Sequence, residues 1–334
     1  MRWISALLIL FLAVASAAAQ PSLRNAEKIN ISGSDYIRLK DWADAIGMTI
    51  RWTKKDEELL VTNKWCRINF KVKSIMSQFN GTDVRLSLPV VARGGGVYIS
   101  ETDINNTLHP LLFPSRNPSG QKIQTICIDP GHGGKDTGKI DKTHHEKRYT
   151  LLLAEETAKQ LRAQGFKVIL TRSRDQTLEL PERVQIANRN RADLFLSLHF
   201  NAADSASVRG AEIYCLTPAG VESSNSGPGR SMIGDYTGNQ NNQKNMLLAY
   251  TIHRSILRNT GLNDRGIKRA RFEVLRSARM PAVLIEGGFM SNPEEARKIY
   301  DAQFRTKLAK GIVDGVVAYK KIVEGSSTIQ NSGT

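Results

Sequence analysis

Residues 125–138 read TICIDPGHGGKDTG, and the second half of the chain is best explained as built around this stretch. It opens with alternating β-prone apolar residues and breaks at Asp129-Pro130-Gly131. It then presents one imidazole, His132, among glycines. Because open α/β folds bind their ligands at the carboxyl edge of the sheet, a strand that ends in such a turn predicts that His132 lies at that edge.

Two further apolar runs end in the same way. The run LFLSL (194–198) leads into His199, and the run AVLI (282–285) leads into Glu286. If the three strands are parallel, all three side chains lie at one edge of the sheet. A buried strand does not need an ionisable residue at its end, so three such ends predict a functional site.

Two histidines at strand ends need a third ligand to hold a catalytic zinc ion, and two histidines with one glutamate form a known set with an open fourth position. Glu146 is the candidate, because its segment brings a carboxylate back beside the first strand end. His144 and His145 are rival ligands. Glu146 is preferred because a carboxylate at a helix start also satisfies backbone donors and suits the helix dipole.

Glu286 has a different predicted role. Its strongly apolar strand disfavours the charged carboxylate, and a carboxyl group poised between its two states suits general acid–base catalysis. In this interpretation Glu286 takes a proton from water and later passes it to the leaving amine. The alternatives are a fourth metal ligand and a purely structural carboxylate.

From Lys122 onward, strand and helix patterns alternate, which is typical of α/β domains. The residues 217–244 are polar and glycine-rich, and they form either a disordered insertion or, as we prefer, a mobile loop near the substrate. The expected strands cover 123–129, 167–171, 193–199, 211–216, 272–275 and 282–286, and the expected helices 150–164, 180–190, 245–260, 292–300 and 303–323.

Residues 25–114 predict a separate small α+β domain of short strands and helices, joined to the rest by a linker at 115–121. Within it, Tyr36-Ile37 followed by Asp41 recurs as Tyr98-Ile99 followed by Asp103, which suggests a duplicated strand–helix unit.

The domain resembles the copper amine oxidase N-terminal-like modules that accompany cell-wall proteins. It holds a single histidine, His109, so the resemblance predicts no metal site there. A wall-binding module and a simple spacer both remain open.

The composition and the first residues of the chain limit its possible partners and its location. The chain has 334 residues, with 47 Lys and Arg against 32 Asp and Glu, giving a formal charge of +15. This charge favours polyanionic partners such as an anionic wall polymer. Residues 1–19 have a positive start, an apolar core and an Ala-x-Ala ending, so they predict a cleaved signal peptide. We therefore expect an exported protein without a nucleic-acid partner or stable membrane insertion, and with a disordered tail at 324–334.

The three cysteines, Cys66, Cys127 and Cys215, are odd in number and widely spaced, and two of them lie in apolar strand-like runs. We expect buried free thiols by default. Whether any disulfide forms is left open, since an exported compartment permits one.

The chain from 122 to 323 resembles the zinc-dependent N-acetylmuramoyl-L-alanine amidases of the amidase-3 family. The motifs that carry the resemblance are IDPGHGGKDTG (128–138), the glutamate after the histidine pair, LSLHFNA (196–202) and RMPAVLIEGGFMSNPEEA (279–296). The resemblance implies a mostly parallel, mixed sheet flanked by helices, and one zinc ion.

The same resemblance assigns the zinc ligands to His132, Glu146 and His199 and the catalytic role to Glu286. It implies hydrolysis of the amide between N-acetylmuramic acid and L-alanine in peptidoglycan, at a periplasmic, wall-associated or secreted location, with a protein activator or regulator. The alternatives are a zinc peptidase acting on stem peptides and a peptidoglycan-binding protein without turnover.

Overall fold

The computed structural model describes residues 22–223, 225 and 234–325. The predicted signal peptide and all but the start of the predicted tail lie outside these residues, as does part of the polar 217–244 stretch. The chain divides into two compact units, residues 1–115 and 116–334. Within the described residues, no helix combines the length and the apolar character needed to cross a bilayer.

The first unit contains two antiparallel sheets and short helices. One sheet has the order β1-β2-β9-β8, and the other is a meander in which β3, β4, β5, β6 and β7 pair in succession. The elements are β1 (Lys28–Ile31), β2 (Ser34–Arg38), α1 (Leu39–Ala45), β3 (Thr49–Lys54), β4 (Glu58–Thr62), β5 (Arg67–Lys71), β6 (Met76–Phe79), β7 (Thr82–Arg85), β8 (Val91–Arg93), β9 (Gly96–Ser100), α2 (Glu101–Asp103), the π-helix η1 (Ile104–Leu108) and α3 (His109–Leu112).

The repeated sequence of this unit forms neighbouring strands. Strands β2 and β9 are antiparallel, and Ile37 pairs with Ile99, the same position of the repeat. Each strand leads directly into a helix. Beside them the indole Nε1 of Trp42 donates to Nε2 of His109 at 3.2 Å. Burial lowers the pKa of His109 to about 4, so this imidazole is a neutral core group at neutral pH.

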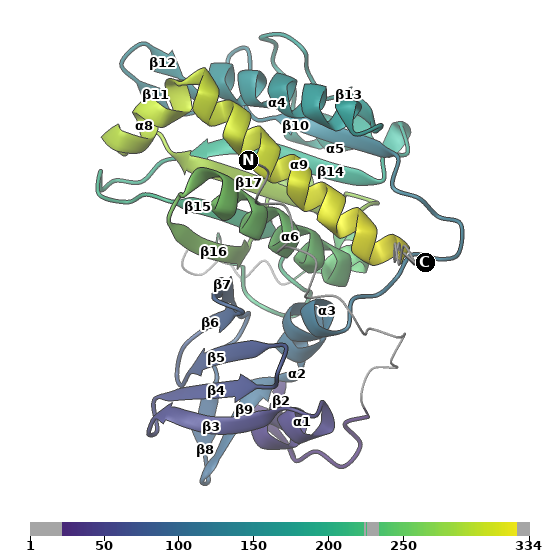
Figure 1. The fold of residues 1–334 in the computed structure, drawn as a ribbon, viewed down its shortest axis with the longest axis vertical. Helices are drawn as coiled ribbons and strands as arrows, with labels where there is room; N and C mark the ends of the chain where they lie inside the picture. The colour runs from purple at the N-terminus through teal and green to yellow at the C-terminus, as the bar shows by residue number, and fades with distance from the viewer. Residues whose placement is uncertain (1–21, 224, 226–233, 326–334) are drawn as a thin grey trace, which may run out of the picture. The chain divides into compact units, whose positions relative to one another are not determined.

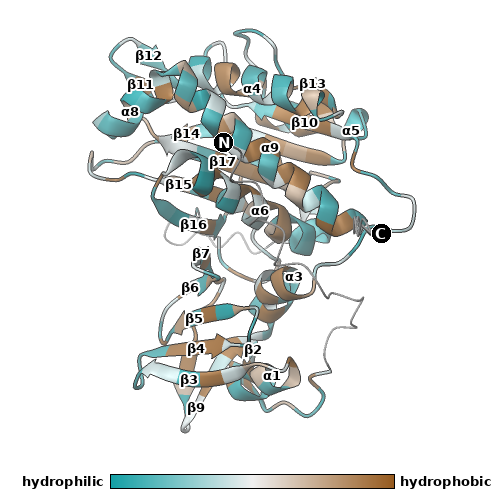
Figure 2. Cartoon of the chain, in the orientation of Figure 1, coloured by the Kyte–Doolittle hydropathy of each residue, from teal (hydrophilic) through white to brown (hydrophobic). Residues whose placement is uncertain are grey.

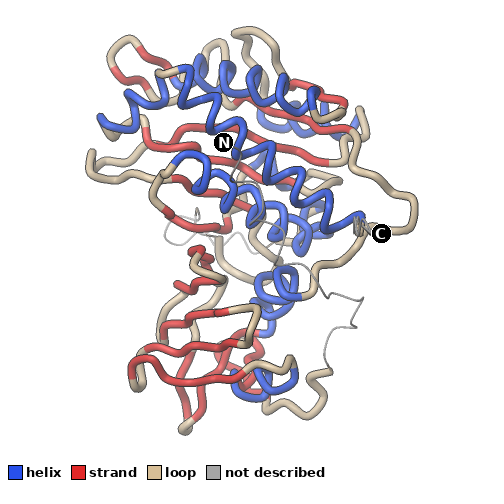
Figure 3. Tube along the Cα trace, viewed as in Figure 1, coloured by secondary structure: helices blue, strands red, loops and turns tan. Residues whose placement is uncertain are grey.

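The second unit is an α/β domain (Figure 3). Its elements are β10 (Thr125–Pro130), β11 (Ile140–Asp141), β12 (His144–His145), α4 (Glu146–Ala163), β13 (Lys167–Leu170), α5 (Leu180–Arg189), β14 (Leu194–Asn201), β15 (Ala211–Cys215), the 3₁₀-helix η2 (Thr237–Asn241), α6 (Asn242–Thr260), β16 (Asp264–Arg269), α7 (Glu273–Arg276), β17 (Ala282–Phe289), α8 (Pro293–Tyr300) and α9 (Ala302–Glu324).

The sheet of this unit is mostly parallel. Its strands lie in the order β13-β10-β14-β17-β15-β16. Strands β13, β10, β14 and β17 are mutually parallel, and β15 runs antiparallel to β17. The central strands β10, β14 and β17 are hydrophobic along most of their length (Figure 2), as strands covered on both faces should be. This confirms the predicted α/β fold with its mixed sheet.

Helices cover both faces of the sheet. Helix α9 packs on α4 and α6, which lie against the strands (Figure 1). On the other face α5 and α7 contact each other, and a core that includes Val184, Phe195 and Leu275 fills the space beneath them. The three cysteines are buried and free, as expected.

One expected strand is a helix instead. Residues 272–275 were expected to form a strand, but residues 273–276 form the short helix α7. An ion pair between Arg276 Nη1 and Glu273 Oε2 at 2.6 Å, three residues apart, supports this helix. Val274 and Leu275 are buried side chains of this helix. A short apolar segment fits a strand or a helix equally well, and the prediction of a strand was wrong.

Candidate metal centre

The turn after β10 positions His132. Its backbone has a φ of +61°, a region that costs energy for a residue with a side chain. The preceding Gly131 lies against the imidazole of His199, where a Cβ atom would come within 2.2 Å of Cε1. A glycine is therefore required at 131 for the two imidazoles to approach each other.

A buried polar network beneath this turn holds it in place. Asp129 is fully buried and accepts from Arg183 Nη1 at 2.9 Å, while Arg183 also donates to the carbonyls of Pro130 and His132. Arg172 donates to the carbonyls of Pro130 and Gly131 from the side of β13. The two arginines thus donate hydrogen bonds to buried carbonyl groups of the turn, which have no partner strand among the described residues to donate to them.

Glu146 is the first residue of α4 and is 4% exposed. Its Oε2 accepts from the backbone N–H of Lys139 at 2.9 Å, and its Oε1 accepts from the backbone N–H of Phe200 at 3.0 Å. The position of Glu146 at the helix start predicts that its carboxylate caps its own helix. These backbone donors come instead from the preceding loop and from β14, so they fix the carboxylate in space relative to the sheet.

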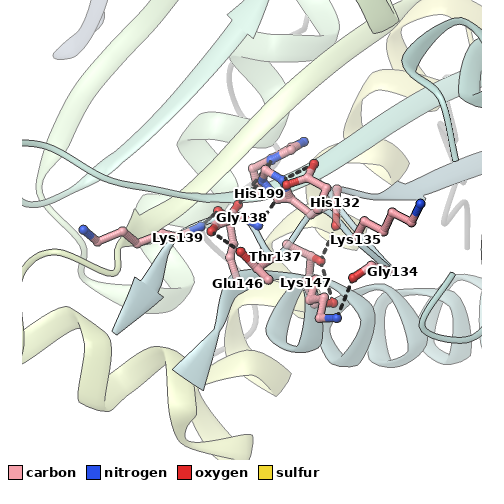
Figure 4. Close-up of polar contacts among 12 residues, drawn as sticks. His132, Gly134, Lys135, Thr137, Gly138, Lys139, Glu146, Lys147 and His199 are labelled. Carbon is pink, nitrogen blue, oxygen red and sulfur yellow. Dashed lines mark hydrogen bonds and ion pairs between the residues drawn. The ribbon is translucent and has the colours of Figure 1, made fainter. Parts of the chain in front are cut away.

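The side chains of His132, Glu146 and His199 converge on one point (Figure 4). Glu146 Oε1 lies 3.0 Å from His132 Nε2 and 3.2 Å from His199 Nδ1, and these two nitrogens are 3.2 Å apart. Three ligands of a tetrahedral zinc ion at ordinary bond lengths are separated by about 3.3 Å. The triangle of donor atoms therefore has the dimensions that a bound metal ion requires.

Asp136 orients the first imidazole. Its Oδ2 lies 2.8 Å from His132 Nδ1, and because a carboxylate only accepts, Nδ1 carries a proton. In the neutral ring this leaves the lone pair of Nε2 facing the cluster. Burial opposes a positive charge on His132, but Glu146 and Asp136 outweigh it and raise the pKa of His132. Burial likewise opposes the Glu146 carboxylate, but the two imidazoles hold the pKa of Glu146 well below its usual range. Asp136 was not among the predicted site residues, although it lies in the stretch 125–138, four residues after His132.

The rival histidines do not join the cluster. His144 hydrogen-bonds through Nδ1 to the hydroxyl of Tyr149, and its ring stacks on Tyr300 at 3.9 Å between ring centroids. His145 lies in the short β12 strand, paired with Ile140. The pair therefore belongs to the hairpin that precedes Glu146, and the donor cluster contains neither histidine.

Glu286 lies beside this cluster, as the strand ends predicted. It pairs with His199 on β14 and with Glu212 on β15, so the three side chains form a row on one face of the sheet. Burial above all, and then the charges of Glu146 and Glu212, raise the pKa of Glu286 well above its usual range. Its Oε2 atom is buried and has no hydrogen-bond partner among the residues that the structure describes.

Glu212 was not predicted from the sequence. It is 2% exposed and accepts hydrogen bonds from Asn201, Tyr214, Arg265 and Lys268. It lies at the beginning of its strand rather than at the end, because β15 runs opposite to β17. Only knowledge of that antiparallel pairing could have placed it beside the three strand-end residues.

The fold and the site together define an α/β protein with two imidazoles and a carboxylate arranged as metal ligands at the carboxyl edge of its sheet. The chain belongs to the N-acetylmuramoyl-L-alanine amidase family Amidase_3, whose sequence profile matches residues 126–318.

Individual proteins of known name are also similar to more than half of the chain. The chain is 33% identical to the N-acetylmuramoyl-L-alanine amidase AmiA of Escherichia coli strain K12, over 66% of this chain and 84% of AmiA. It is 38% identical to the amidase LytC of Bacillus subtilis strain 168, over 59% of this chain but only 35% of LytC. A solved structure of the CwlD amidase from Clostridioides difficile, in complex with the GerS lipoprotein, is 26% identical, with a TM-score of 0.50, and covers 60% of this chain and 99% of CwlD.

We predict that Arg183→Met destabilises the protein by about 3–5 kcal/mol, because it leaves the Asp129 carboxylate buried without its partner. Chemical denaturation of the second unit's transition measures this change. Arg189→Met, on the exposed face of the same helix, is the control and should change the free energy of unfolding by less than about 0.5 kcal/mol. Equal effects of the two variants would contradict a special role for the buried pair.

Proposed function

We propose that the protein is a zinc-dependent amidase that hydrolyses the amide bond between N-acetylmuramic acid and L-alanine in peptidoglycan. The observation that carries the proposal is the triangle of His132, Glu146 and His199 donor atoms beside Glu286 in a chain of the amidase family. Relatives that share this domain bear the amidase name. The net charge of +15 suits an anionic wall polymer as substrate.

The three donors fit a zinc ion in kind as well as in spacing, since two neutral imidazoles and one carboxylate leave a fourth position open. When bound there, zinc would act as a Lewis acid toward the scissile carbonyl and increase the acidity of water. The protein orients these three donor groups through hydrogen bonds. Asp136 fixes the tautomer of His132, and backbone N–H groups hold both oxygens of Glu146.

Glu286 performs the proton transfers in this proposal. Because burial raises the pKa of its carboxyl group, Glu286 is a stronger base than an exposed glutamate. It takes a proton from the attacking water and gives it to the nitrogen of the leaving L-alanine. Its Oε2 atom has no hydrogen-bond partner among the described residues, so this oxygen can accept the proton.

We infer further that the chain is exported and acts at the cell wall. The apolar segment at 1–19, which has the form of a signal peptide, supports export. The first unit would serve as a wall-binding module similar to the copper amine oxidase N-terminal-like domains. A protein regulator is a further proposal, supported by the solved complex of the CwlD amidase with a lipoprotein.

Digestion of purified peptidoglycan by the protein lacking residues 1–19 tests the proposed function. We expect new L-alanine amino termini and released stem peptides, and we expect both to disappear when a chelator is added and to return with zinc. Cleavage only between amino acids would support a stem-peptide peptidase instead. Binding without any metal-dependent release would support a non-catalytic wall protein.

We predict that Glu286→Ala retains stoichiometric zinc and loses hydrolysis by about 10²–10⁴-fold, the range that general acid–base catalysis supplies. Zinc content by mass spectrometry and release of L-alanine termini are the two measurements. Glu294→Ala, which removes a carboxylate that is 66% exposed, is the matched control and should remain active. Loss of zinc from Glu286→Ala would place Glu286 among the ligands.

For His144→Ala we predict near-normal zinc content, because its imidazole is engaged by Tyr149 and Tyr300 outside the donor triangle. The loss of ring packing should lower the free energy of unfolding by about 1–3 kcal/mol. His132→Ala provides the contrast and should contain no stoichiometric zinc. A zinc-free His144→Ala protein that is still folded would overturn the choice of Glu146 as the third ligand.

A further inference from the structure

Glu212 accepts four hydrogen bonds beside the site, yet the proposed reaction gives it no role. Its Oε1 accepts from Arg265 Nε at 2.5 Å and from Lys268 Nζ at 2.6 Å. Its Oε2 accepts from the hydroxyl of Tyr214 at 2.7 Å and from Asn201 Nδ2 at 3.1 Å. An ionised carboxylate offers about four acceptor positions, so these donors fill all of them.

The neighbouring Glu286, in contrast, has a carboxyl oxygen without a hydrogen bond in the described part of the chain. The two glutamates are directly paired residues of antiparallel strands, a position in which side chains contact each other. Glu286 Oε2 is buried without a hydrogen-bond partner among the described residues, while four donors bond Glu212 beside it. Two cations and two carboxylates share this corner of the sheet, and both cations form ion pairs with Glu212.

The two cations are held differently. Arg265 has its guanidinium 5.1 Å from the centre of the Phe289 ring, which adds a second anchor, and its side chain is 35% exposed. Lys268 is only 15% exposed, and its ammonium group is 5.8 Å from the Tyr214 ring. Lys268 pairs with Tyr214, two residues from Glu212. Its ammonium group reaches Glu212, the residue paired with Glu286 on the next strand. It is therefore the group that would turn to Glu286 if Glu212 did not hold it.

We propose that Glu212 is a positioning residue that holds Lys268 and Arg265 in ion pairs of its own and thereby keeps the Glu286 carboxyl group out of a salt bridge. A carboxylate bound to an ammonium group is a weaker proton acceptor, and a buried pair of that kind is hard to separate. The neighbouring negative charge of Glu212 thus preserves Glu286 for proton transfer. This inference rests on the proposed function, because it assumes that Glu286 transfers protons.

The test is a double-mutant cycle on kcat with a soluble muramoyl-peptide as substrate. In Glu212→Gln the ion pair between Glu212 and Lys268 is lost, and we expect kcat to fall by about 10-fold or more with KM changed by less than about 3-fold and zinc retained. In Glu212→Gln combined with Lys268→Met the competing cation is gone. The double variant should therefore be more active than Glu212→Gln alone.

If Glu212 had only a structural role, the double variant should be less active than Glu212→Gln alone, because a second substitution in the same network would lower activity further. Glu324→Gln is the matched control, because Glu324 is also a buried carboxylate paired with a lysine, Lys320, and its Oε1 accepts from the backbone of Ile123 at the opposite end of β10. It should leave kcat within about 2-fold of the wild type.

Should Glu212→Gln fail to fold, the double variant is compared with Lys268→Met alone. The proposal predicts that these two differ by less than about 3-fold in kcat, because Glu212 then has no lysine to hold. A larger difference would overturn it, as would a double variant no more active than a folded Glu212→Gln. Wild-type protein without chelator-sensitive amidase activity would instead overturn the proposed function.

Discussion

The buried ion pair between Asp129 and Arg183 is the contact on which the rest of the site depends. Removing both charges from water is costly, and the pair is stable because nearly every remaining polar position is bonded. Asp129 also accepts from Thr171 and Ser197 on the flanking strands, and Arg183 also reaches the carbonyl of His132. One pair thus joins the strands β13, β10 and β14 to the turn. The strained backbone of His132 persists because this network overdetermines it.

Three residues at the carboxyl edge of the sheet could be predicted because each follows an uninterrupted apolar run. Such runs indicate buried parallel strands, and parallel strands bring distant residues to one edge without further information. His132, His199 and Glu286 were found in this way, and the parallel pairing of their strands confirms the reasoning. Glu146 required an additional argument from chain proximity, and the structure places it within the same triangle of atoms.

The residues that sequence patterns missed are those whose partners come from elsewhere in the fold. Arg172 and Arg183 look like ordinary surface arginines, since neither lies beside its carbonyl partners in sequence. Strand β16 was overlooked because it is rich in charged residues, two of which face Glu212. In each case a polar side chain is buried by a long-range contact, and local periodicity carries no information about such contacts.

The positions of the cysteines have a consequence for the conditions under which the second unit can fold. Cys127 lies on β10 and Cys215 on β15, with β14 and β17 between them. Strands three positions apart are separated by about 14 Å, twice the Cα separation that a disulfide tolerates. These two cysteines therefore cannot form a disulfide in the folded unit, and the unit folds without one. The folded unit thus carries no internal disulfide that a reducing environment could break.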